Sequence, residues 1–175
     1  MRTRVLALLL VCVGSSTLGC KTLSEVSIGY ADAVTTSQLP SEGPWSGVDV
    51  AFPSLTDMDP LSSPSLTRYA VKPEEIEAVK LTSVELEGSA GDCGLPFAAV
   101  ELQLVAAELG PTSLATAVRE GECLQWTLSS DDLSAWFRQP KISIVALVDG
   151  EPIADAQSLS LRVSFMVDIA DKRID

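Results

Sequence analysis

The sequence predicts an all-β fold, an antiparallel β-sandwich of about seven strands with one or two short helical turns. Several segments alternate apolar and polar residues with a period of two, the pattern of a strand that buries one face. Turn residues separate these segments, and no strand–helix–strand rhythm occurs. Two antiparallel sheets that bury their apolar faces against each other satisfy these observations.

The clearest strand comes near the end of the chain, where six apolar residues share one face: Leu159, Leu161, Val163, Phe165, Val167 and Ile169. The same pattern predicts shorter strands at 48–52, 76–87, 98–104, 114–118, 124–128 and 142–148. Within 76–87 the apolar positions change parity at Thr82-Ser83, which predicts a β-bulge. The dipeptide Asp149-Gly150 predicts a turn between strands.

Two short segments predict helical turns. Ser130 is placed to cap a turn over 131–137, which has acidic residues at its start, and a second turn is expected over 72–75, with proline in a first-turn position. Trp136 and Phe137, which belong to the predicted turn over 131–137, allow two interpretations. They are either an aromatic patch for a partner or an acyl chain, or a plug over the open end of the sandwich. We favour the plug, since that apolar end needs a cover.

The N-terminal 19 residues predict a signal peptide. The chain begins with two arginines and no acid, and an unbroken run of nine apolar residues follows from Val5 to Val13. A spanning helix needs about 20 such residues. The run has the length of the apolar region of a secretory signal, and small residues come after it.

Thr17-Leu18-Gly19-Cys20 resembles the lipobox of bacterial lipoproteins, in which a small residue precedes a lipidated cysteine. The likeness departs from the usual pattern because Leu18 stands one position late. It implies cleavage before Cys20, acyl chains on Cys20 and membrane attachment through that lipid alone. The alternative is an ordinary secretory signal cut at the same bond. In many such lipoproteins an aspartate directly after the lipidated cysteine retains the protein in the inner membrane. Here that position holds Lys21, which by analogy favours the outer membrane.

Removal of 1–19 leaves 156 residues, which suits one domain. Residues 20–46 are rich in Ser, Thr, Gly and Pro, so we expect a lipidated N-terminus and flexible tether there, and the sandwich domain over 47–175. The mature chain keeps ten basic and 24 acidic residues, a formal charge of −14. This charge argues against a nucleic-acid partner, whose phosphates require basic residues.

The cysteines fit an oxidising compartment. Cys12 leaves with the signal and Cys20 takes the lipid, so Cys93 and Cys123 remain. We expect a disulfide between them in the cell envelope. The alternative is two buried free thiols.

The order of elements resembles the immunoglobulin-like sandwich of late-embryogenesis-abundant type 2 proteins and of small bacterial lipoproteins of that shape. The residues that carry the resemblance are the strands Val79–Leu86 and Val100–Leu104, the element Asp132–Phe137 and the long final strand. It covers roughly residues 48–170. It implies a fold and no activity.

Much catalytic chemistry is absent from the sequence. There is no histidine, which excludes Ser-His-Asp and Cys-His catalysis and histidine metal sites. No phosphate-binding glycine loop or CxxC pair occurs, so we expect no cofactor. Asp57 and Asp59 offer oxygens to calcium, but no complete calcium loop follows, so we expect a solvated turn and no metal.

Three functions remain. The preferred hypothesis is a membrane-anchored envelope lipoprotein whose non-enzymatic sandwich domain binds an envelope protein partner or has a structural role. The first alternative is a carrier of a lipid or other apolar ligand, which requires a cavity between the sheets. The second is a small carboxylate-dependent hydrolase, which requires two acids close together in a cleft.

Overall fold

The computed structural model describes residues 21–35, 43–88, 93–151 and 158–174. These residues form eight strands. In chain order they are β1 (Lys21–Thr35), β2 (Trp45–Ala51), β3 (Ile76–Glu87), β4 (Phe97–Ala106), β5 (Gly110–Glu120), β6 (Cys123–Leu128), β7 (Ser143–Gly150) and β8 (Ser158–Ile174). The all-β prediction is confirmed, with one strand more than the seven expected.

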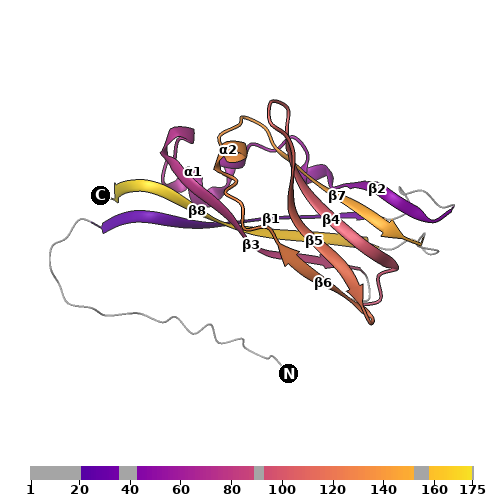
Figure 1. The fold of residues 1–175 in the computed structure, drawn as a ribbon. Coiled ribbons are helices and arrows are strands. Elements are labelled where there is room, and N and C mark those ends of the chain that lie inside the picture. Colours follow the sequence, from indigo (N-terminus) through magenta and orange to yellow (C-terminus); the bar gives the residue numbers. More distant parts are fainter. Residues whose placement is uncertain (1–20, 36–42, 89–92, 152–157, 175) are drawn as a thin grey trace, which may run out of the picture.

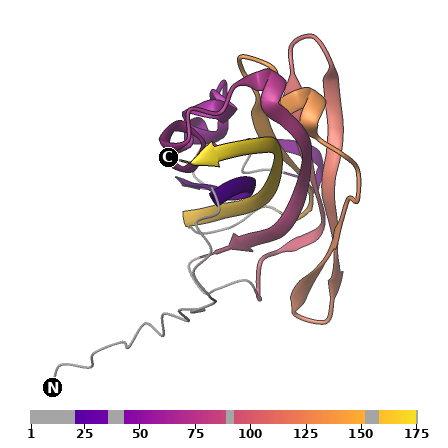
Figure 2. The same cartoon turned by 90° about the vertical axis from the view of Figure 1, so that its left-hand side faces the viewer.

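The strands form two antiparallel sheets that pack face to face (Figures 1 and 2). One sheet has three strands in the order β1-β8-β3, and the other has five in the order β2-β7-β4-β5-β6. The alternation of side chains along each strand places one set of residues between the sheets. The inner faces join in one hydrophobic cluster, in which Phe52, Phe97, Phe137 and Phe165 are fully buried. The space between the sheets is therefore filled by side chains of the protein.

The two long sequence patterns correspond to β3 and β8. Strand β3 has the predicted bounds, and its pairing with β8 shifts register between Leu81 and Ser83, which confirms the predicted bulge. Strand β8 is the central strand of its sheet and pairs with β1 on one side and β3 on the other. Its length follows from these partners, because a central strand has its backbone groups paired on both edges.

The prediction of a flexible tether over 20–46 is wrong for its first part. Residues 21–35 form β1, which pairs with β8 from Lys21 opposite Ile174 to Thr35 opposite Ser158. Val26, Ile28 and Val34 are buried with a period of two. Asp32 stands at one of the inward positions of the strand, and serine, glycine and alanine occupy much of the outward face, so the apolar alternation is weak in the sequence.

The described residues contain more helical turns than the one or two expected. They are Pro53–Leu55, Pro60–Ser62, Pro64–Arg68 (α1), Pro73–Glu75 and Ser134–Phe137 (α2), and the turn predicted over 72–75 is among them. Three of them, Pro53–Leu55, Pro60–Ser62 and Pro64–Arg68, fall between β2 and β3, where the sequence predicts neither a helical turn nor a strand. They cover the free edge of β1, where the Tyr30 hydroxyl donates to the carbonyl of Pro60 (2.9 Å) and the Ser54 amide donates to Asp32 (2.6 Å). A covered edge cannot pair with another chain.

Candidate functional site

A disulfide joins Cys93 to Cys123, as predicted. Cys93 lies between β3 and β4, Cys123 begins β6, and their Cα atoms are 4.2 Å apart. Beside the bond, the Gly94 amide donates to the carbonyl of Glu122 (2.9 Å). The bond ties the connection between the two sheets to the edge strand β6. With both sulfurs bonded, neither is a nucleophile.

Phe137 lies in the core, so it is not part of an exposed aromatic patch. It is 0% exposed, and its ring meets that of Phe165 edge-on at 5.0 Å between centroids. Trp136 is half-buried, and its indole nitrogen donates to the carbonyl of Gly110 (3.1 Å). Both aromatic residues of α2 therefore pack onto the sandwich, which is the geometry expected of a plug.

Asp132, for which the sequence predicted no hydrogen-bonding role, positions α2. Its carboxylate accepts hydrogen bonds from the Val79 amide (2.9 Å) and from the Ser134 amide (3.0 Å) and hydroxyl (2.9 Å). The Leu133 amide returns a bond to the carbonyl of Val79 (2.8 Å). The predicted cap at Ser130 is wrong, because α2 begins only at Ser134 and Asp132 provides the polar contacts at its start.

The pKa of Asp132 is lowered. Desolvation acts in the opposite direction, but the hydrogen bonds from Val79 and Ser134 and the charge of Arg138 outweigh it. Since the folded-state pKa lies below the unfolded one, the bonded carboxylate stabilises the protein above the ordinary aspartate pKa of about 3.9. That contribution is lost as the pH falls through the lowered pKa.

We expect Asp132→Ala to lower the free energy of unfolding by about 1 kcal/mol at pH 7, the usual net effect of losing side-chain hydrogen bonds. The difference from the parent should be unchanged at pH 5 and should shrink below about pH 4, as the folded carboxyl takes up a proton. Urea unfolding at several pH values measures this. Asp131→Ala is the matched control, since Asp131 is equally exposed but its carboxylate accepts none of these hydrogen bonds. An equal loss for both variants would contradict the assignment.

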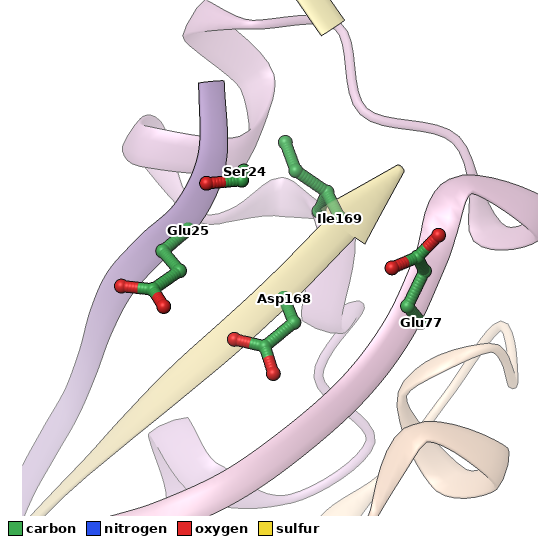
Figure 3. Close-up of a pocket in the computed structure, with 5 residues that line it drawn as sticks. All are labelled: Ser24, Glu25, Glu77, Asp168 and Ile169. Atoms are coloured by element: carbon green, nitrogen blue, oxygen red, sulfur yellow. The ribbon is translucent and has the colours of Figure 1, made fainter. Parts of the chain in front are cut away.

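Three carboxylates gather on the outer face of the three-stranded sheet. Glu25 on β1, Asp168 on β8 and Glu77 on β3 line a shallow hollow of about 470 Å³ with Ser24 and Ile169 (Figure 3). Glu25 is the direct cross-strand partner of Asp168. The sequence did not reveal this cluster, because Glu25 was assigned to the tether and strand register brings the three acids together.

The hollow has neither the donors of a metal site nor the setting of an acid catalyst. Among the residues that the structure describes, no group of three or more carboxylate, cysteine or histidine side chains could hold a metal ion. A carboxyl that acts as a general acid needs an enclosed, apolar environment that keeps it protonated. Glu25 and Glu77 are exposed to solvent. The arrangement supplies negative charge on an open sheet face.

Like charges in cross-strand pairs destabilise a sheet. We therefore expect Glu25→Gln to raise the free energy of unfolding by up to about 0.5 kcal/mol at low salt. Glu85→Gln is the matched control: it is the same change on the same face, but Glu85 forms an exposed ion pair with Arg162 (2.8 Å). That variant should lose up to about 0.5 kcal/mol. Both effects should shrink at high salt, and a shift of the two variants in the same direction would contradict the charge argument.

A second hollow, of about 330 Å³, lies on the outer face of the five-stranded sheet. Ala99, Val118 and Leu147 contribute apolar surface, and Glu101 and Asp149 are among its polar residues. Val118 is 60% exposed. Both hollows lie on outer faces of the sandwich, outside the packed space between the sheets.

The two aspartates considered for calcium have separate contacts. Asp59 accepts from the Leu61 amide (2.9 Å) at the start of a helical turn, and the Asp57 amide donates to the hydroxyl of Ser143 (2.9 Å). The pKa of Tyr30 is raised, first by burial and then by the charge of Asp59. The Tyr30 hydroxyl therefore keeps its proton and donates a hydrogen bond to the carbonyl of Pro60.

Comparison of the chain with protein-family models, curated proteins and solved structures found no match. The likeness to late-embryogenesis-abundant type 2 domains and to lipoprotein signals therefore stays a prediction. Cys20 lies outside the described residues. Within the described part of the chain, no helix is long and apolar enough to cross a membrane.

Proposed function

We propose that the protein is an envelope lipoprotein, exported, cleaved before Cys20 and anchored by acyl chains on that cysteine. The observation that carries the proposal is the use of the cysteines. Cys93 and Cys123 are bonded to each other, and a disulfide is typical of an oxidising compartment. Cys12 belongs to the predicted signal, so Cys20 is the one mature cysteine left for lipid.

The proposed cleavage is compatible with the fold. The first strand, β1, begins at Lys21, so cleavage before Cys20 would leave every described helix and strand in the mature protein. The membrane proposed is the outer membrane, for which the evidence is the lysine after Cys20.

The mature domain is proposed to bind an envelope protein partner or to serve a structural role, without catalysis. The hydrophobic cluster between its sheets gives no support to the carrier alternative, which needs space there. The acidic hollow is open and lacks an enclosed carboxyl, so it gives little support to a hydrolase. A rigid sandwich with open outer faces suits contact with a macromolecule better than enclosure of a small ligand.

Membrane fractionation of Cys20→Ser tests the anchor. We expect the parent to remain in the envelope pellet after high-salt washing and the variant to move to the soluble fraction, because a polar domain without its acyl chains has no stable anchor. Cys12→Ser is the matched control and should stay in the pellet. Retention of Cys20→Ser in the washed pellet would overturn the proposal.

A further inference from the structure

The ladder between β1 and β8 extends beyond the rest of the three-stranded sheet. Strand β3 pairs with β8 only as far as Ile76 opposite Ile169, whereas β1 continues to Lys21 opposite Ile174. Residues 170–174 of β8 thus have a strand on one side only, over about 17 Å. Figure 1 shows this two-stranded ribbon projecting past α1. We call its last three pairs, Lys21–Leu23 with Lys172–Ile174, the stem.

The stem is directly joined to the proposed lipid site. Cys20 is bonded to Lys21, the first residue of β1, so no spacer residue separates the acylated cysteine from the sheet. A flexible tether of 27 residues would have let the domain wander about 30 Å from its lipid. A lipid fixed to the end of a strand instead holds that end of the sandwich at the bilayer.

Charge favours the same orientation. The six positions of the stem include Lys21, Lys172 and Arg173, three of the ten basic residues in the mature chain, although Asp171 and Asp175 beside them in the sequence offset part of this charge. Anionic headgroups attract basic residues and repel acidic ones. The next rows of the sheet carry the acidic hollow on their outer face, so that face is repelled from an anionic bilayer (Figure 3).

We propose that the anchored protein stands end-on on its membrane, with the stem against the phospholipid headgroups and the sheets rising away from the bilayer. The inference rests on the proposed lipidation of Cys20 and adds the orientation. It identifies the distal end of the sandwich, near Glu87 and Ser160, as the end presented to the surroundings.

Fluorescence quenching by headgroup-labelled nitroxide lipid tests the orientation. Full-length lipidated protein, in vesicles of phosphatidylethanolamine and phosphatidylglycerol, carries one fluorophore at Ser24→Cys or at Glu87→Cys. Both positions are exposed. Ser24 lies between Leu23 and Glu25, whose partners on β8 are Lys172 and Asp168, so about 26–40 Å of β8 separates it from Ser160, the partner of Glu87. We expect quenching at position 24 to be at least about threefold stronger than at position 87, because nitroxide quenching requires close approach and this distance separates the two probes.

An insertion of eight Gly and Ser residues between Cys20 and Lys21 is the control, since it keeps the lipid but adds about 16 Å of flexible reach. The ratio between the two positions should then fall toward one. Equal quenching in the parent, with acyl mass present on the Cys20 peptide, would overturn the end-on orientation and leave the anchor intact. Absence of acyl mass would overturn the proposed function, and the orientation with it.

Discussion

Phe165→Ala is expected to lower the free energy of unfolding by about 3–5 kcal/mol, because truncation of a fully buried phenylalanine leaves a cavity that the core cannot fill. Phe165 lies on β8, the central strand of its sheet, with Ile28 and Leu81 as its cross-strand partners. Its ring contacts those of Phe137 (5.0 Å) and Tyr30 (6.1 Å) edge-on. One side chain therefore connects all three strands with α2.

The next residue along β8 provides the matched control. Met166 points to the outer face and is half-buried, so Met166→Ala should cost less than about 1 kcal/mol. Urea unfolding followed by circular dichroism measures both variants. A larger loss for Met166→Ala than for Phe165→Ala would mean that β8 is shifted by one residue, since such a shift exchanges its two faces.

Loss of the disulfide is the second large effect expected. The bond closes a loop across 30 positions, and the chain-entropy model assigns such a loop about 3–4 kcal/mol of stability. The double variant Cys93→Ser/Cys123→Ser should unfold at correspondingly lower urea. The strand that it ties, β6, is otherwise held weakly, because it is an edge strand that pairs with β5 alone.

Reduction of the parent protein provides the control for that prediction. Dithiothreitol should lower the stability of the parent to that of the double variant and should leave the double variant unchanged. A double variant within about 0.5 kcal/mol of the oxidised parent would show that the bond contributes little to the fold, as strain or residual structure in the unfolded chain can cause.

The strands with strong local alternation were predictable from the sequence. Residues 76–87 and 159–169 carry their burial pattern in the order of their own side chains, and even the bulge at Thr82-Ser83 followed from a change of parity. The disulfide followed from counting cysteines. In these cases the information lies within the segment or in the composition.

Strand β1 was missed because its stability comes from a distant partner. Residues 26–34 contain Gly29 and the inward Asp32, so their intrinsic strand preference is low. Their backbone groups pair with β8, more than 120 positions away in the sequence. The three helical turns within 53–68 were missed for a related reason: each is only three to five residues long, too short for a periodic pattern.

The candidate sites depended on contacts between distant residues to a greater degree. The acidic hollow needs the registers of β1 with β8 and of β8 with β3, and no local pattern encodes either. Asp132, and not Ser130, makes the polar contacts at the start of α2, because its carboxylate accepts a hydrogen bond from the Val79 amide on β3. Phe137 is buried for the same reason, since Phe165 on β8 is its ring partner.

The mass of the N-terminal peptide, taken from protein extracted from its own envelope, tests the lipid anchor most directly. The proposed function predicts a mature chain that begins at Cys20 and carries the added mass of at least two acyl chains on that residue. A chain that begins at Cys20 with a free thiol, or that keeps residues 1–19, would contradict it.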